Sequence, residues 1–468
     1  MVKSSLLRRA EMNVVEELER IFHPRGVVIV GASNRPGNLG SFFLSGFIQQ
    51  GFAKDRLYVI HPSEKEVAGV KAYPAARDIP GDVDLAVVYS PRETVPDVVN
   101  DCTLKGIKGI VVCTSGFAEN GIEGRHLQQR VVEIARAGGT RLIGPNCVGI
   151  FCPSSGLTNF GGLMPMEGGT VGMFSHSGSL SVMFPVAASA MGIHFSKVIS
   201  CGNACDLNES DFLEYFGKDQ ETEIIIAYME GVHDGRRFFQ LAKEISKRKP
   251  IIVWKCGDSD VGSRAAASHT GALAGSPQVW DAVFRQTGMI RAEGADDVLD
   301  LLQAFYHLPL PQGNRVAIMS GMGGMGVAIA DACVDSGLSI AELSAATRER
   351  LKAVVPSVGT CVDNPVDLGM MSGFNRHIYV ETLKALAQDE GVDIIMLTIG
   401  SWQQDYVRKV FGLMKGIDKP MALITTPASG VLMTGMKPDK GIAIFPGGRR
   451  AAQVMSQMVA YQRSRSAR

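Results

Sequence analysis

A single histidine stands among small residues in the stretch SRAAASHTGALAGS, residues 263–276. The neighbours of His269 are too small to fill a core and too sparsely charged to form a solvated face. We interpret the stretch as a loop that lies close to a ligand, because small side chains permit such an approach. An imidazole in this setting is a candidate base or nucleophile.

Such an imidazole usually needs an acid that orients its second ring nitrogen. Glu230, in the stretch AYMEGVHDG, follows a predicted strand of the same part of the chain. The ends of neighbouring parallel strands converge on one edge of a sheet, so we predict that Glu230 is the partner of His269. The alternative is a solvated residue at the end of a strand.

A helix is predicted to begin in the stretch FSHSGSLSVMF, at Ser177, Gly178 and Ser179. Hydroxyl residues at a helix start act as N-caps, and the free N–H groups there attract an anion. The GxSxG pattern of serine hydrolases fails, since Met173 and Ser175 stand at its positions. The helix field is worth only about 0.3–2 kcal/mol, enough to place a phosphate but too little to cleave a bond.

Two glycine-rich turns are further candidates for ligand binding. VIVGASNRPGNLG, residues 28–40, lies between a predicted strand and helix and suits a nucleotide or CoA phosphate, with a tight turn as the alternative. Its spacing is not GxGxxG, so NAD is not favoured there. GMGGMG, residues 321–326, has that spacing, but the acid expected about 20 residues on is ambiguous, so this turn binds a ligand or only packs a helix on a sheet.

The composition bounds the class of protein. The 468 residues predict two to four domains, and 47 basic against 47 acidic residues give no support for a nucleic-acid or membrane-surface partner. Nine single cysteines without a CxxC pair predict neither disulfides nor a metal site, and fit a reducing cytoplasm. The N-terminal segment is interpreted as a short amphipathic helix, and no apolar run approaches the ~20 residues that span a bilayer.

Alternation of short apolar strands with longer amphipathic stretches predicts an α/β protein of parallel, doubly wound sheets. The pattern runs over residues 25–150, breaks at a linker at 151–168, and restarts. The segment 276–308 is predicted to be helical and to close the second unit, before a second linker at 309–314. The same plan thus occurs three times, with expected domains at 20–150, 168–308 and 312–460.

Taken together, the motifs resemble one family. VIVGAS, GVKAYP, VDLAVV, SGFAE, LIGPNCVGI, SHSGSL, GNACDLNESDFLEY, YMEGVHDGRRF, RAAASHTGALAG and NPVDL occur in order over about residues 20–460. This series resembles the nucleoside-diphosphate-forming acyl-CoA synthetases, in particular the α subunit or α-like half of the ADP-forming type. The resemblance implies a Rossmann-like CoA-binding domain followed by two flavodoxin-like domains.

The resemblance also implies a reaction and residue roles. Acyl-CoA, phosphate and ADP interconvert with a carboxylic acid, CoA and ATP through an acyl phosphate and a phosphohistidine. The phosphorylated histidine of the family falls on His269 and its partner glutamate on Glu230. The helix start that holds phosphate falls on Ser177, Gly178 and Ser179, and the CoA-binding positions fall on Gly31, Ala32, Ser33, Asn34, Pro91 and Asn146.

The nucleotide site is expected elsewhere. The glycine-rich, lysine-bearing and acidic metal-binding motifs of an ATP-grasp domain do not occur in the sequence. The resemblance therefore implies that ATP, ADP and Mg²⁺ bind to a separate ATP-grasp β subunit in a heterotetramer. A loop of small residues around His269 would let the phosphohistidine travel between the two sites.

Some positions depart from the family pattern, and two other functions stay open. His176 stands for glutamine, His61 and Ser63 stand for asparagine and lysine, and Ala204 stands for lysine. Lys65 or Arg92 is a candidate to replace the missing lysine at a CoA phosphate. The alternatives are an NAD-dependent oxidoreductase that uses residues 321–326 and a CoA-binding regulatory chain without turnover. The pair of His269 and Glu230 speaks against the second.

Overall fold

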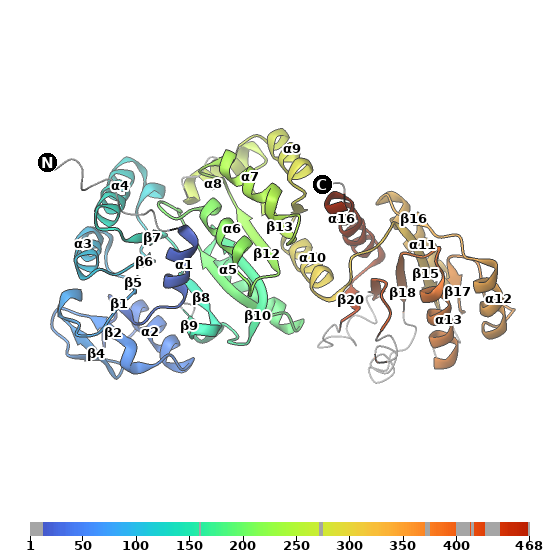
Figure 1. The fold of residues 1–468 in the computed structure, drawn as a ribbon, viewed down its shortest axis with the longest axis horizontal. Helices are drawn as coiled ribbons and strands as arrows, with labels where there is room; N and C mark the ends of the chain where they lie inside the picture. The colour runs from blue at the N-terminus through green and yellow to red at the C-terminus, as the bar shows by residue number, and fades with distance from the viewer. Residues whose placement is uncertain are drawn as a thin grey trace. The chain divides into compact units, whose positions relative to one another are not determined.

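The computed structural model describes residues 13–158, 161–270, 275–369, 375–398, 412, 416–425 and 440–466. Within these ranges the strands form three sheets, drawn in blue, green and orange to red in Figure 1. Two compact units result: the first extends to Arg291 and holds the first two sheets, and the second begins at Ala292, with Ala190–Ile193 grouped with it. The predicted α/β architecture of three parallel-sheet parts is confirmed.

The first sheet has the strand order β3-β4-β2-β1-β5-β6-β7, and only the β3–β4 pair is antiparallel. Its strands are β1 Val27–Val30, β2 Leu57–Ile60, β3 Glu66–Val67, β4 Val70–Tyr73, β5 Leu85–Val88, β6 Gly109–Val112 and β7 Arg141–Ile143. The helices are α1 Val14–Phe22, α2 Leu39–Gln49, α3 Val95–Lys105 and α4 Gly121–Gly138.

The apolar run of β1 shows why this sheet is covered on both faces. All four residues are buried. Val27 and Ile29 pack into one hydrophobic cluster, whereas Val28 and Val30 pack into another. Because successive strand residues point to opposite faces, an unbroken apolar run requires a core on each side.

The second sheet has the order β14-β13-β12-β10-β11-β8-β9. Its strands are β8 Ile150–Cys152, β9 Leu157–Thr158, β10 Gly168–Ser175, β11 Phe195–Ser200, β12 Ile224–Met229, β13 Ile251–Lys255 and β14 Ile290–Ala292. The helices are α5 Gly178–Ala190, α6 Glu209–Lys218, α7 Gly235–Ile245, α8 Asp260–Thr270 and α9 Pro277–Thr287. Strands β10 to β13 pair in parallel, so their carboxyl ends lie at one edge.

The stretch predicted as a linker at 151–168 belongs in part to this second sheet. Strand β8 pairs antiparallel with β11, and β9 pairs antiparallel with β8. Strands this short show no sequence period, and for that reason the prediction was wrong there. Residues 159–160 lie outside the described residues.

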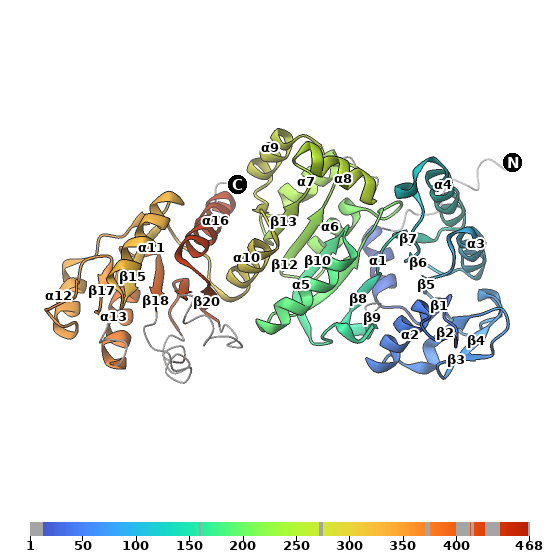
Figure 2. The same cartoon turned by 180° about the vertical axis from the view of Figure 1, so that it is seen from behind.

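Helix α1 joins the first two sheets within the first unit. It contacts β6, β8 and α6, and both views of the ribbon show it between the two sheets (Figures 1 and 2). The Tyr215 hydroxyl of α6 donates to Glu19 at 2.7 Å, and the Tyr215 ring stacks on Phe22 at 5.2 Å. A polar and an aromatic contact thus fix this N-terminal helix.

The third sheet has the order β16-β15-β18-β19-β20, with β17 paired to β15, and all these pairs are parallel. Its strands are β15 Arg315–Ser320, β16 Ser339–Ile340, β17 Val366–Asp367, β18 Ile394–Thr398, β19 Met421–Ile424 and β20 Ile442–Phe445. The helices are α10 Ala295–His307, α11 Gly323–Asp335, α12 Ala345–Val354, α13 Arg376–Gln388 and α16 Gly448–Ser466. None of the helices in the described ranges is long and apolar enough to cross a bilayer.

Helix α10 differs from the sequence-based expectation. We predicted that it closes the second domain, but it packs against β20 and α16 of the second unit. Asp300 accepts from Arg450 Nε at 2.5 Å, and Gln303 accepts from the Ile444 N–H at 3.1 Å. These partners lie 150 and 141 residues further along the chain, beyond the reach of any local pattern.

Candidate functional site

The structure brings His269 and Glu230 together. Glu230 directly follows β12, and its Oε1 lies 2.8 Å from His269 Nδ1. The Glu230 side chain is 4% exposed, whereas the His269 side chain is 54% exposed. When the carboxylate accepts the Nδ1–H, the proton-free Nε2 is left on the open side, as a nucleophile requires.

The histidine stands on a helix and not on the predicted loop. Residues 260–270 form α8, with His269 in its last turn. The Ser259 hydroxyl accepts the Gly262 N–H at 3.0 Å and caps the helix start. The interpretation as a loop was wrong for these residues, because the small side chains include a run of alanine, the strongest helix former. Residues 271–274 of the predicted stretch lie outside the described residues.

Asn146 lies at the end of α8. Its Nδ2 is 3.4 Å from the His269 carbonyl oxygen and 3.4 Å from Asn203 Oδ1. The residue adopts a left-handed backbone with φ of 58°, a conformation that asparagine tolerates better than most residues. Asn203 in turn donates to Glu119 at 2.6 Å, so α8 is tied to the loop before α4. The structure therefore places Asn146 beside the histidine.

The predicted helix start is present at the neighbouring strand end. Helix α5 begins at Gly178, after a short turn that follows the end of β10 at Ser175. The Ser175 hydroxyl accepts the Ser177 N–H at 3.1 Å and donates to the Ser177 carbonyl at 2.8 Å. A Cβ on Gly178 would lie 2.9 Å from the Val148 side chain, so this position suits glycine. A helix start leaves backbone N–H groups free, and such groups are suited to an anion.

Sequence reasoning missed Glu209 and His233, which contact each other close to this helix start. Glu209, the first residue of α6, is fully buried and lies 2.7 Å from His176 Nε2. It also accepts the His233 backbone N–H at 3.1 Å, and the His233 ring lies 3.1 Å away. Although burial alone raises it, the pKa of Glu209 lies well below its usual range because both histidines hydrogen-bond to the carboxylate. An acid in the first turn of a helix is typical of a surface position, so no sequence signal marked it.

A cavity of about 900 Å³ lies at the carboxyl ends of the first sheet and includes three of the predicted CoA-binding residues, Gly31, Ser33 and Pro91. Its wall includes the buried Ser90 hydroxyl, which has no hydrogen-bond partner among the described residues. A Cβ on Gly31, at φ of 95°, would lie 2.8 Å from the Tyr89 carbonyl carbon. Close backbone approach and an unpaired buried hydroxyl fit a bound polar ligand.

The other predicted CoA-binding residues lie off this wall. Ala32 is buried, and Asn34 donates to Glu64 and, at 2.8 Å, to the Glu66 carbonyl. Neither of them, nor Asn146, lines the cavity. Three of the six predicted positions therefore line the cavity, and three do not.

The cations around the cavity differ from those expected. Arg92 pairs with Glu93 at 2.8 Å, and neither Arg92 nor Lys65 lines the cavity, whereas Arg35 does. His61 accepts the Glu64 N–H at 2.9 Å through Nδ1, as an asparagine side chain also could. His61 therefore holds this turn and also lines the cavity, and Arg35 is an arginine that lines it.

The GxGxxG turn of the second unit carries a carboxylate at its centre. Helix α11 begins at Gly323, and a Cβ there would lie 2.5 Å from Asp367 Oδ2. Negative charge at a helix start repels a phosphate from the place that a dinucleotide would use. The turn thus supports the packing interpretation and speaks against the oxidoreductase alternative.

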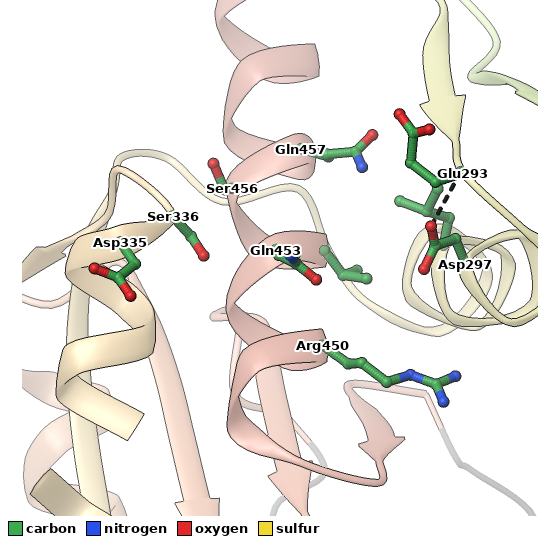
Figure 3. Close-up of a pocket in the computed structure, with 10 residues that line it drawn as sticks. Glu293, Asp297, Asp335, Ser336, Arg450, Gln453, Ser456 and Gln457 are labelled. Carbon is green, nitrogen blue, oxygen red and sulfur yellow. Dashed lines mark hydrogen bonds between the residues drawn. The ribbon is translucent and has the colours of Figure 1, made fainter. Parts of the chain in front are cut away.

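A second cavity, of about 310 Å³, lies among α10, α11 and α16 (Figure 3). The acidic residues Glu293, Asp297 and Asp335 line it, and Asp297 accepts the Glu293 N–H at 3.0 Å. Arg450 also lines it, but pairs with Asp300. This cavity is therefore unsuited to an anion. In the described part of the chain, no three His, Cys, Asp or Glu side chains are grouped to hold a metal ion.

Three protein-family models match successive parts of the chain. A CoA binding domain matches residues 25–153, a succinyl-CoA ligase like flavodoxin domain matches residues 168–305, and a ligase-CoA domain matches residues 316–422. The first two contain the cavity of the first sheet and the pair of His269 and Glu230.

Individual relatives match over most of the chain. The α subunit of acetate–CoA ligase [ADP-forming] II of Pyrococcus furiosus is 42% identical over 379 residues, which are 81% of each chain. Acetate–CoA ligase [ADP-forming] I of Archaeoglobus fulgidus is 36% identical over 84% of this chain, which spans 56% of that longer protein. The solved structure of dinucleotide forming acetyl-coenzyme A synthetase 1 of Ca. Korarchaeum cryptofilum, in complex with phosphate and ADP, is 32% identical, with a TM-score of 0.84 over 96% of this chain and 97% of that one.

Proposed function

The chain belongs to the family of ADP-forming acyl-CoA synthetases, and from this premise we propose that it acts as the α subunit of such an enzyme. It would interconvert acyl-CoA, phosphate and ADP with a carboxylic acid, CoA and ATP. The observation that carries the proposal is the 2.8 Å contact between His269 Nδ1 and Glu230, because it leaves Nε2 as a nucleophile at the surface.

The reaction would run in three transfers. A phosphate oxygen attacks the thioester carbonyl, the C–S bond breaks, and CoA leaves as the thiol with a proton from phosphate. His269 Nε2 then attacks phosphorus, the bond between phosphorus and the acyl oxygen breaks, and the carboxylate leaves. An ADP oxygen finally takes the phosphoryl group, and the N–P bond breaks to give ATP and the free imidazole.

Each described feature has a part in these steps. Glu230 stabilises the positive charge that develops on the ring as the N–P bond forms, because it holds the Nδ1 proton. Ser177, Gly178 and Ser179 at the start of α5 would hold the phosphate. The cavity of the first sheet would hold CoA, with Arg35 toward a CoA phosphate and Ser90 as a further donor.

We place the remaining parts of the reaction on a partner. The relative from Pyrococcus furiosus is named as an α subunit, which supports a second subunit here. An ATP-grasp β subunit would bind ADP, ATP and Mg²⁺, and a heterotetramer is the proposed assembly. Movement of His269 between the two sites and a location in the cytoplasm remain predictions.

The test is transfer of labelled phosphate to the chain in the presence of a panel of acyl-CoAs, with and without an ATP-grasp β subunit. We expect an acid-labile, base-stable label that His269→Ala abolishes. The matched control is His126→Ala on α4, an exposed histidine on a helix of the first unit. Label that persists in His269→Ala would overturn the assignment. If CoA binds but no acyl-CoA gives label, the regulatory alternative is favoured.

A further inference from the structure

A buried imidazole touches both halves of the proposed site. His176 follows β10 and precedes the start of α5, and its backbone N–H donates to the Tyr228 carbonyl at 3.2 Å. Its side-chain Nδ1 accepts the Glu230 N–H at 3.0 Å. His176 therefore hydrogen-bonds to the backbone of Tyr228 and of Glu230, on either side of the last residue of β12. Glu230 is also the residue whose carboxylate contacts His269.

The hydrogen bonds determine where the proton of this ring lies. Since Nδ1 accepts a backbone N–H, the ring proton is on Nε2, and it is donated to Glu209 at 2.7 Å. Glu209 has no exposed surface and accepts in addition from the backbone and ring of His233. A buried carboxylate is stable only when several donors satisfy it, so His176 is locked in one orientation.

This cluster has no chemical role of its own. His176 is 3% exposed and both its nitrogens are already hydrogen-bonded, so a phosphoryl group has no access to it. The carboxylate of Glu209 lies between two rings that donate to it. Because one nitrogen of the His176 ring donates and the other accepts, this ring has no lone pair left for a metal ion.

We propose that His176, held by Glu209 and His233, is a positioning residue that aims the Glu230 carboxylate at His269 and sets the start of α5 beside it. The inference rests on the proposed function for its kinetic test. The backbone N–H of Glu230 is fixed by the ring, and the side chain leaves the same Cα, so loss of the ring displaces the carboxylate. Displacements of about 1 Å at a reacting group can cost roughly 10²-fold in rate.

The test compares two replacements of one residue. His176→Leu removes both hydrogen bonds, whereas His176→Gln keeps an acceptor and a donor on one side chain. We expect His176→Leu to slow phosphorylation of His269 by about 10- to 100-fold per labelled chain, and His176→Gln to stay within about threefold of the wild type. The KM for acyl-CoA should stay unchanged, since that cavity lies in the first sheet.

The matched control is His194→Leu. His194 precedes β11 and pairs with Glu167 at 2.8 Å, so it lies at the opposite edge of the same sheet. If His176 had only a structural role, His176→Leu would lower the number of chains that accept label. The rate per labelled chain would then stay unchanged. That result, or equal rates for His176→Leu and the wild type, would overturn the proposal.

A readout without turnover separates this inference from the proposed function. In ¹H–¹⁵N spectra of histidine-labelled chain, we expect His269 to carry its proton on Nδ1 in the wild type and in His176→Gln. In His176→Leu we expect the two neutral tautomers of His269 to exchange, so that the proton is shared between Nδ1 and Nε2. If no acyl-CoA labels the wild type but this change occurs, the proposed function fails and the positioning role stands. An unchanged His269 signal in His176→Leu contradicts the positioning role whatever the activity.

A second variant carries the test should His176→Leu not fold. Glu209→Gln removes the buried charge but keeps the size of the side chain, and its amide can turn to donate to His176 Nε2. The His176 proton would then move to Nδ1, against the Glu230 N–H. We expect a smaller loss of rate, about 3- to 10-fold, with the same change in the His269 signal. Wild-type rate and signal in this variant would also overturn the proposal.

Discussion

Two turns in this chain have the same local construction and different surroundings. Ser175 precedes α5 and Ser320 precedes α11, and each hydroxyl accepts the N–H two residues on, at 3.1 and 3.0 Å. Each also donates to the carbonyl of that residue, at 2.8 and 2.9 Å. Both turns lead from a parallel strand into a helix of 13 residues that begins with glycine.

The difference lies in what the neighbouring strands bring to each turn. Beside α5, the end of β12 supplies Glu230, which faces His269. Beside α11, the end of β18 supplies Thr398, which bonds the Ser320 hydroxyl at 2.8 Å, and β17 supplies Asp367 at the helix start. One turn lies beside the pair of Glu230 and His269, and the other carries the Asp367 carboxylate at its helix start. A strand–turn–helix pattern alone therefore does not make a site.

The largest effect is expected when the acid at each turn is replaced by its neutral amide. Glu230→Gln should slow phosphorylation of His269 by about 10²-fold, because the neutral amide stabilises the developing imidazolium less. Asp367→Asn, the equivalent change at the second turn, should leave that rate unchanged. Single-turnover labelling with acyl-CoA and phosphate measures both. A loss of rate in Asp367→Asn as large as in Glu230→Gln would remove the distinction between the turns.

An intermediate effect is expected at the two glycines. Gly178→Ala places a Cβ 2.9 Å from the Val148 side chain, which must shift the start of α5. We expect the KM for phosphate to rise about threefold to tenfold, because a helix terminus of this kind contributes about 0.3–2 kcal/mol to anion binding.

Gly323→Ala is the comparison at the second turn. Its Cβ would lie 2.5 Å from Asp367, so we expect a loss of about 1–3 kcal/mol in the stability of the second unit through overpacking. Urea unfolding measures this loss, and phosphate kinetics should stay at the wild-type value. A phosphate KM that rises in Gly323→Ala and not in Gly178→Ala would reverse our assignment of the anion site.

The comparison also shows what the sequence could and could not predict. Apolar runs such as β1 and the restart at β10 marked the sheets, and the rule that parallel strand ends converge led to the contact of Glu230 with His269. Asp367 lies 44 residues from Gly323, with no pattern that relates them.

Similar long-range contacts account for the other misses. Glu209 and His233 have the appearance of polar surface residues, although the fold buries the first and sets the second against it. Helix α10 is recognisable as a helix, but its partners on β20 and α16 follow only from the tertiary fold. Local sequence patterns predict the helices, the strands and the edge of the sheet where the strands end. The charged residues that distinguish one such edge from another come from segments far away in the sequence.

The smallest expected effect is a pH dependence that only one turn has. The hydrogen bond to Glu209 raises the pKa of His233 above its ordinary value, despite the opposing effect of partial burial. A raised folded-state pKa stabilises the fold below the unfolded value of about 6.5, and that contribution is lost as pH rises through the folded pKa. The second turn has the neutral pair of Ser320 and Thr398 in this place.

Hydrogen exchange of the α6 amides in wild type and His233→Ala, compared at each pH, measures this contribution. We expect the protection lost in the variant to be greatest below about pH 6.5 and to shrink above it. The α11 amides serve as the internal reference and should show no such trend, because His233 belongs to the first unit. If the difference in α6 protection between wild type and His233→Ala grew with rising pH, His233 would be held neutral. Glu209 would then be stabilised by His176 and the backbone alone.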